Sequence, residues 1–221
     1  MQITDKIDHP NCQIYLITPP VIKDLARFCD ALEAALSAAP VACLQIRLKD
    51  MADEDIIHHA LTIKEIAHRH NTLVLMNDSP ELALKASLDG AHIGQDDMDY
   101  FSSREMLGAR AIIGVTCHNS RDLAFVAADA GADYVAFGAF FDTRTKQAKT
   151  KAELEILTWW SQTIEIPCVA IGGITVDNAA TIIKAGADFI ALSSGVWNHP
   201  KGPKFAVSQL ASLCSEHSPS P

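Results

Sequence analysis

The chain has 221 residues, 48% of them hydrophobic and 20% charged, which is the composition of a globular protein and not of a disordered one. Its formal net charge of −9 at pH 7 argues against a nucleic-acid-binding surface, and no apolar run approaches the roughly 18 to 20 residues that cross a bilayer. The start of the chain, residues 1–10, also lacks the apolar core of a signal peptide.

Short strand-like runs alternate with helical stretches along the chain. We predict strands at Gln13–Thr18, Ala42–Arg47, Leu73–Met76, Ala91–Ile93, Ala111–Thr116, Tyr134–Gly138, Cys168–Ile171 and Phe189–Ser193. We predict helices near Lys23–Ala38, Asp53–His70, Pro80–Ser87, Ser102–Leu107, Ser120–Ala130, Ala152–Thr163, Val176–Ala185 and Pro203–Cys214. Strict alternation of the two kinds of element is typical of parallel β–α units in an α/β fold.

The alternation predicts a single (β/α)8 TIM barrel over residues 1–214, followed by a flexible C-terminal tail at 215–221. A doubly wound open sheet is the main alternative, but the strands are short and similar in length, which favours closure. Two segments also repeat, Ala130–Ala136 and Ala185–Ala191, and in each a glycine ends a helix before the next strand. This repeat supports a fold built from similar units.

The cysteines indicate a reducing environment. None of them forms a C-x-x-C pair and several lie within apolar runs, so we interpret them as reduced thiols of a cytoplasmic protein and not as metal ligands. The six are Cys12, Cys29, Cys43, Cys117, Cys168 and Cys214. We expect neither nucleic acid nor a membrane as a partner.

The active site of such a barrel lies at the C-terminal ends of its strands. In the second predicted strand, period-two alternation places Gln45, Arg47 and Lys49 on one face and three aliphatic side chains on the other. The aliphatic face can meet the surrounding helices, which directs the cations to the barrel mouth. Two such cations repel each other unless an anion or carboxylates lie between them. A bound anion and neutralisation by structural carboxylates are both compatible with the sequence.

Carboxylates follow the third and fourth predicted strands. Asn77-Asp78 ends one strand, and the segment Asp89–Asp97 ends the next with Asp96 and Asp97. Carboxylates without His or Cys partners are hard oxygen ligands that suit Mg²⁺, which leaves its other positions for water and substrate phosphate. Helix capping by Asp78, and by Asp96 or Asp97, is the alternative.

The segment Gly114–His118 ends the fifth strand with a hydroxyl and an imidazole. His118 could act as an acid or base, or could cap the following helix, and both readings stay open here. Cys117 has no base marked beside it, which argues against a nucleophilic role.

The segment Gly138–Lys146 places a glycine, two threonines and a lysine where the sixth strand opens into a loop. Small and hydroxyl side chains let backbone N–H groups approach an anion, and the lysine adds a charge. Glycines in Ala170–Thr175 and hydroxyls in Ala191–Gly195 end the last two strands, where barrels often bind a phosphate. The alternative for the first loop is an ordinary surface loop with a solvated lysine.

These motifs resemble those of the thiamine-phosphate synthase family, in the same order and over about Tyr15 to Val196. The family pattern reads Q-x-R-x-K, N-D, D-G-x-H-x-G-Q-x-D, G-V-S-x-H, a T-x-T-K loop, A-I-G-G-I and a final hydroxyl strand. The matching segments are Gln45–Lys49, Asn77-Asp78, Asp89–Asp97, Gly114–His118, Gly138–Lys146, Ala170–Ile174 and Ser193-Ser194.

The resemblance implies a transferase that joins a hydroxymethylpyrimidine diphosphate to a thiazole phosphate and releases pyrophosphate. It implies Mg²⁺ as cofactor, held by Asp78 and Asp97, and catalytic roles for Arg47, Lys49, Thr116 and Lys146. The pyrimidine diphosphate would bind Gln45, Ile46, Arg47, Leu48, Lys49, Asn77, Thr116 and Lys146. The thiazole phosphate would bind Thr143, Arg144, Thr145, Gly173, Ser193 and Ser194.

The sequence departs from the family pattern at four positions. Thr116 replaces a serine but keeps the hydroxyl, Ala139 and Asp142 stand where prolines are usual, and Ser79 replaces a basic residue. Two alternatives follow: a thiazole tautomerase-like enzyme of the same barrel family, which would use His118, and a non-catalytic sensor of phosphate ligands. Both the synthase and the tautomerase-like enzyme would act on small-molecule substrates. A homo-oligomer is compatible with either enzyme and with the sensor.

Overall fold

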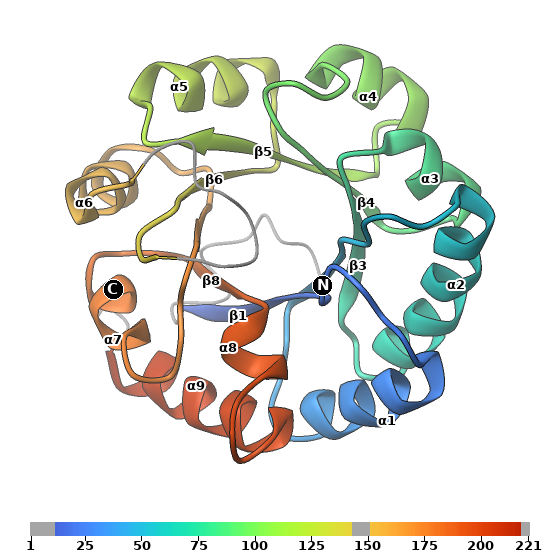
Figure 1. Ribbon diagram of the computed structural model, residues 1–221. Helices are drawn as coiled ribbons and strands as arrows, with labels where there is room; N and C mark the ends of the chain where they lie inside the picture. Colours follow the sequence, from blue (N-terminus) through green and yellow to red (C-terminus); the bar gives the residue numbers. More distant parts are fainter. Residues whose placement is uncertain (1–11, 143–150, 218–221) are drawn as a thin grey trace.

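Eight parallel strands close into a barrel and helices surround it, as Figure 1 shows along the barrel axis. The structure, a computed structural model, describes residues 12–142 and 151–217. The strands are β1 (Gln13–Ile17), β2 (Cys43–Ile46), β3 (Leu73–Asn77), β4 (Gly90–Ile93), β5 (Ile112–His118), β6 (Tyr134–Gly138), β7 (Cys168–Ile171) and β8 (Phe189–Leu192).

Helices follow the strands in turn and form the outer ring (Figure 1). They are α1 (Leu25–Leu36), α2 (Asp53–Arg69), α3 (Pro80–Lys85), α4 (Tyr100–Leu107), α5 (Arg121–Ala130), α6 (Leu154–Thr163), α7 (Ala179–Lys184), α8 (Ser194–Trp197) and α9 (Pro203–His217). None of the helices in the described ranges combines the length and apolar character needed to span a membrane.

The strand register closes the barrel. Tyr15 of β1 lies opposite Cys43 of β2 on one side and Ala191 of β8 on the other, and every neighbouring pair is parallel. The predicted (β/α)8 barrel is therefore confirmed. The open-sheet alternative is wrong, because an open sheet has two edge strands and this one has none among its eight.

The barrel wall separates two apolar cores. Leu44 and Ile46 belong to the large core between the strands and the helices, whereas Tyr15, Leu75 and Tyr134 belong to the smaller core inside the barrel. Alternate side chains of a strand point to opposite faces of the sheet, so most strands supply residues to both cores, whereas β4 supplies only the outer one. Because both faces are covered, the strands are apolar almost throughout.

One helix was not predicted, and another extends beyond its predicted end. The sequence analysis did not predict α8, because four residues are too few to show a helical period; its Trp197 Nε1 donates to the carbonyl of Ile17 at 2.6 Å. Helix α9 continues to His217, three residues beyond the predicted end at Cys214. Residues 215–217, predicted as part of a tail, are therefore helical, and residues 218–221 lie outside the described part of the chain.

Three aspartates tie neighbouring strands together at the N-terminal end of the barrel. Asp89, Asp133 and Asp188 directly precede β4, β6 and β8, and each accepts the backbone N–H of a residue at the start of the preceding strand, at 2.7 to 2.8 Å. Asp133 and Asp188 are the aspartates of the two repeated segments. The repeat thus encodes a strand-to-strand hydrogen bond at the end opposite the barrel mouth.

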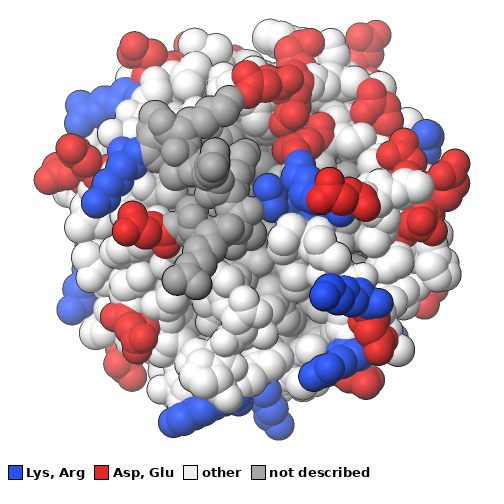
Figure 2. All heavy atoms as spheres, in the orientation of Figure 1, with Lys and Arg blue, Asp and Glu red and all other residues white. Residues whose placement is uncertain are grey.

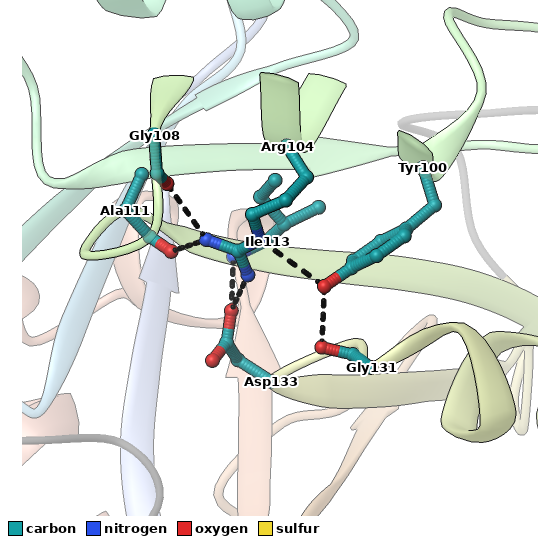
Figure 3. A network of polar contacts seen from close by, with 7 residues as sticks. All are labelled: Tyr100, Arg104, Gly108, Ala111, Ile113, Gly131 and Asp133. Atoms are coloured by element: carbon teal, nitrogen blue, oxygen red, sulfur yellow. Dashed lines mark hydrogen bonds and ion pairs between the residues drawn. The ribbon is translucent and has the colours of Figure 1, made fainter. Parts of the chain in front are cut away.

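Arg104 of α4 completes this arrangement at Asp133 (Figure 3). Its Nη2 lies 2.7 Å from Asp133 Oδ2, its Nη1 donates to the carbonyls of Gly108 and Ala111, and its Nε donates to Tyr100 Oη at 3.1 Å. One planar guanidinium therefore bonds a helix, the loop after it and the start of a strand, as its five donors allow.

Replacing Arg104 with alanine is expected to lower the free energy of unfolding by about 2 kcal/mol, because the half-buried Asp133 carboxylate loses its charged partner and two carbonyls lose their bonds to the guanidinium. Urea unfolding measures this change. The matched control is Arg110→Ala, an exposed arginine of the neighbouring loop, which should change stability by less than about 0.5 kcal/mol. Equal stability of the two variants would contradict the structural role of Arg104.

Candidate active site

Acidic and basic side chains meet at the C-terminal ends of neighbouring strands. Arg47 and Lys49 follow β2, Asp78 follows β3 and Asp97 follows β4, and these three strands are hydrogen-bonded neighbours in the barrel. Figure 2 shows basic and acidic groups side by side near the centre of this face, with further acidic groups toward α4. Arg47, Lys49, Asp78 and Asp97 therefore share one rim, whereas the predicted Lys146 lies outside the described residues.

Lys49 and Asp78 form an ion pair across two strand ends, with Nζ 2.9 Å from Oδ2. Both side chains are partly exposed, 44% and 35%, so the pair contributes little to stability. Asp78 has a positive φ of 65°, and its backbone N–H donates to the carbonyl of His92 at 2.8 Å, which fastens it to β4. An aspartate adopts this left-handed conformation more readily than most residues do.

Arg47 presents an unsatisfied donor at the rim. Its backbone N–H donates to Thr18 Oγ1 at 2.9 Å, which holds the end of β2 against the end of β1. Its Nη1 is buried and has no hydrogen-bond partner in the part of the chain that the structure describes. A guanidinium stays charged at any ordinary pH, and a buried donor without a partner is costly. This atom is suited to bind an anion that enters the mouth.

The other residues of this segment alternate as predicted. Gln45 is 3% exposed and lies inside the barrel, where its Nε2 donates to Tyr15 Oη at 3.1 Å. Ile46 and Leu48 pack in the outer core, so only their backbone groups can reach a ligand at the mouth. The substrate contacts predicted for Ile46 and Leu48 can thus involve the main chain only.

The capping alternative for the carboxylates is wrong. Ser79 caps α3 by accepting the N–H of Leu82, and Asp99 caps α4 by accepting the N–H of Ser102. Asp97 Oδ2 instead accepts the N–H of Gly94 at 2.7 Å. Asp78 and Asp97 are therefore placed at the mouth for a reason other than helix capping.

The donor chemistry of these two carboxylates fits Mg²⁺. A carboxylate has two oxygens with about four lone-pair directions, so it can bind a cation as well as accept hydrogen bonds. Within residues 12–142 and 151–217, no group of three or more His, Cys, Asp or Glu side chains gathers as a metal site. That excludes, for these residues, a zinc-type ligand set. It does not conflict with Mg²⁺, which commonly takes one or two carboxylates.

Thr116 lies at the mouth end of β5 with its hydroxyl 2.7 Å from His92 Nε2, and its carbonyl accepts from Gln95 Nε2. The N-cap residue of α5 is Ser120 and not His118, which also has a positive φ, 54°. Cys117 is fully buried in the outer core, and burial raises the pKa of its thiol to about 12. A thiol that stays protonated cannot serve as the nucleophile.

The loops after β6, β7 and β8 pack backbone against backbone. A Cβ added at Gly173, whose φ is +64°, would lie 2.5 Å from the carbonyl oxygen of Asp142, and one at Gly195 would lie 2.2 Å from that of Ile174. Ser193 Oγ donates to the carbonyl of Thr18 at 3.2 Å, and Ser194 begins α8 and is exposed. The predicted residues Thr143, Arg144, Thr145 and Lys146 lie outside the described residues.

Three interior residues escaped the sequence analysis. Tyr15, Tyr134 and His92 lie inside the barrel beneath the mouth and bond to one another or to predicted site residues. Burial raises the pKa of both tyrosine hydroxyls well above its ordinary value, so they stay protonated. The only signal in the sequence was a tyrosine hydroxyl or a histidine imidazole at inward positions of otherwise apolar strands.

Comparisons with known proteins agree with this geometry. Residues 14–196 match the family model described as thiamine monophosphate synthase. A thiamine-phosphate synthase of Rhodospirillum centenum is 52% identical over 200 residues, covering 90% of this chain and 96% of that protein. One of Hyphomonas neptunium is 49% identical, covering 92% and 94%. The solved structure of thiamine phosphate pyrophosphorylase from Pyrococcus furiosus superposes with a TM-score of 0.82 at 28% identity, covering 94% and 98%. The chain belongs to the thiamine-phosphate synthase family.

Proposed function

We propose that the barrel mouth joins 4-amino-2-methyl-5-hydroxymethylpyrimidine diphosphate to 4-methyl-5-(2-phosphoethyl)thiazole, giving thiamine phosphate and pyrophosphate. The observation that carries this proposal is Arg47 Nη1, which is buried and has no hydrogen-bond partner among the described residues, together with the Lys49–Asp78 ion pair across two strand ends. Such a site suits a multiply charged anion with a cation bound to it. A diphosphate with Mg²⁺ has that character.

The reaction needs no nucleophile from the protein. The bond between the pyrimidine methylene and the diphosphate oxygen breaks, and its electron pair leaves with pyrophosphate. The thiazole nitrogen then donates its lone pair to the methylene carbon and forms the new C–N bond. The protein contributes positioning and the stabilisation of negative charge on the leaving group.

The charged rim is suited to the leaving group. Arg47 and Lys49 would bind the diphosphate from β2, with Lys146 and the hydroxyl of Thr116 as further donors. Asn77 and Gln45 would bind the pyrimidine diphosphate beside them. Asp78 and Asp97 would hold Mg²⁺, which when bound neutralises charge on the diphosphate.

The opposite side of the mouth is suited to the phosphate of the thiazole. The glycine at 173 lets the backbone approach closely, and Ser193 and the exposed Ser194 lie at the end of β8. Thr143, Arg144 and Thr145 would complete this site. Barrels commonly bind a phosphate at the ends of their seventh and eighth strands.

The further properties follow from the same proposal. The partners are the small-molecule substrates, with no nucleic acid and no membrane. We also propose a cytoplasmic location, because the six cysteines are free thiols and five of them are buried. Size-exclusion chromatography with light scattering would measure whether the protein forms a homo-oligomer.

The test mixes both substrates with the purified protein and measures pyrophosphate. We expect release that requires both substrates and falls by about 100-fold or more when EDTA removes Mg²⁺. Binding of thiamine phosphate without any turnover would indicate the sensor, and tautomerisation of the thiazole without pyrophosphate would indicate the tautomerase. Full activity in EDTA would overturn the role of the metal but not the proposed reaction.

A further inference from the structure

Five polar side chains form one continuous hydrogen-bonded chain across the inside of the barrel. Gln45 Nε2 lies 3.1 Å from Tyr15 Oη, which lies 2.9 Å from Tyr134 Oη. Tyr134 Oη lies 2.8 Å from His92 Nδ1, and His92 Nε2 lies 2.7 Å from Thr116 Oγ1. The chain thus links two proposed substrate-binding residues, Gln45 and Thr116, through residues with no role in the proposal above.

The packing around the chain shows that its geometry is fixed. A Cβ added at Gly114 would lie 1.9 Å from Cζ of Tyr134, so the tyrosine ring occupies the space where a side chain of β5 would otherwise lie. The rings of His92 and Tyr134 stack with centroids 5.6 Å apart, and Tyr15 meets Tyr134 edge to face. All four interior members are buried, so water cannot replace their bonds.

The order of protons along the chain follows from counting donors. If Tyr15 donates to Tyr134 and Tyr134 donates to His92 Nδ1, each phenol donates once and accepts once. Gln45 then supplies the bond that Tyr15 accepts, and His92 Nε2–H donates to Thr116.

The reverse order leaves one donor poorly bonded. Tyr15 would then accept from both Gln45 and Tyr134, and its own proton could go only to the thiol of Cys43, with which it makes a side-chain hydrogen bond. Sulfur is a weak acceptor, so the first order is favoured. Since neither buried tyrosine loses its proton at ordinary pH, both can donate.

We infer that His92 is a positioning residue: the interior chain fixes its neutral Nε2–H tautomer, and His92 thereby directs the hydroxyl proton of Thr116 to the barrel mouth. There that proton can bond to an oxygen of the leaving pyrophosphate, so the inference rests on the proposed function. In histidines generally, the hydrogen bond made by one ring nitrogen decides which of the two nitrogens carries the proton.

The first test is a double-mutant cycle on kcat. Thr116→Val should lower kcat by about 100-fold, and His92→Leu by about 10-fold or more. The double variant should match Thr116→Val within about twofold, because His92 acts through the hydroxyl that is already gone. KM for the thiazole phosphate should stay within about twofold throughout. Independent, multiplying effects of the two substitutions would overturn the inference.

The second test does not depend on activity. The ¹⁵N chemical shifts of the His92 ring should show a bare Nδ1 and a protonated Nε2, with the resonance assigned by its loss in His92→Gln. Tyr134→Phe keeps the ring and removes the bond to Nδ1, so both tautomers should then be populated and kcat should fall. The matched control is Tyr100→Phe, whose hydroxyl lies at the other end of the barrel and which should change neither.

These outcomes separate the two proposals. A protonated Nδ1 in the unmodified protein, or a tautomer unchanged in Tyr134→Phe, would refute the positioning role even if pyrophosphate is released normally. Absence of pyrophosphate release by the unmodified protein would refute the proposed function, while the tautomer measurement would still report on the chain. If His92→Leu fails to fold, Tyr134→Phe and His92→Gln carry the test.

Discussion

Replacing Arg47 with alanine is expected to lower kcat/KM by about 100- to 1,000-fold without lowering the free energy of unfolding. The guanidinium would stabilise negative charge on the departing pyrophosphate. In the free protein, however, its Nη1 is buried without a partner among the described residues, so the fold gains no bond from that atom. Activity and stability should therefore move in different directions, as at sites where a strained or unpaired group serves function.

The measurement pairs steady-state pyrophosphate release with urea unfolding. Arg47→Lys should also lose most activity, because an ammonium cannot reproduce the planar, two-pronged contact of a guanidinium with a phosphate. The matched control is Arg69→Ala, whose exposed ion pair with Glu33 lies on the outer surface and should affect neither quantity strongly. A marked loss of stability in Arg47→Ala together with normal kinetics would contradict the assignment.

Replacing Asp78 with asparagine is expected to lower turnover by about 100-fold or more and to raise the Mg²⁺ concentration needed for half-maximal activity. The substitution removes the charge that would hold the metal and that pairs with Lys49. Asparagine is the better choice than alanine because Asp78 has a φ of 65°, a conformation that asparagine tolerates. The change in activity then reports on charge and not on backbone strain.

Lys49→Met separates the two possible roles of Asp78. If Asp78 serves only to orient Lys49, the double variant should match either single variant, and the Mg²⁺ requirement should not change. If Asp78 holds the metal, Lys49→Met should lower turnover at an unchanged Mg²⁺ requirement. The matched control is Asp129→Asn on the exposed surface of α5, which should be indistinguishable from the unmodified protein. Normal turnover in Asp78→Asn would refute the metal assignment.

The pattern of apolar residues predicted the helices and strands well, because each kind of element has its own period. All eight strands lie within one or two residues of their predicted bounds, since apolar runs bounded by turn residues mark buried parallel strands. Alternation also placed Gln45 inside the barrel and Ile46 in the outer core correctly. The helix α8 was missed because it has a single turn.

Helix capping was assigned less well. The sequence offered two or three polar residues before each of α3, α4 and α5, and any of them could accept a backbone N–H. In the structure the N-caps of these helices are Ser79, Asp99 and Ser120, and not Asp78 or His118. The choice depends on backbone dihedral angles, which neighbouring strands impose and which no local pattern records.

The sequence by itself determined the alternating elements, the order of the strands and the residues at each strand end, because these depend on period and on chain order. Only the tertiary structure decided which charges touch. It paired Lys49 with Asp78, left Arg47 Nη1 buried without a partner in the described chain, and joined β1, β2, β4, β5 and β6 through the interior tyrosines and His92. Contacts across a closed barrel join residues far apart in sequence, such as Tyr15 and Tyr134, so their pairing is a property of the register and curvature of the sheet.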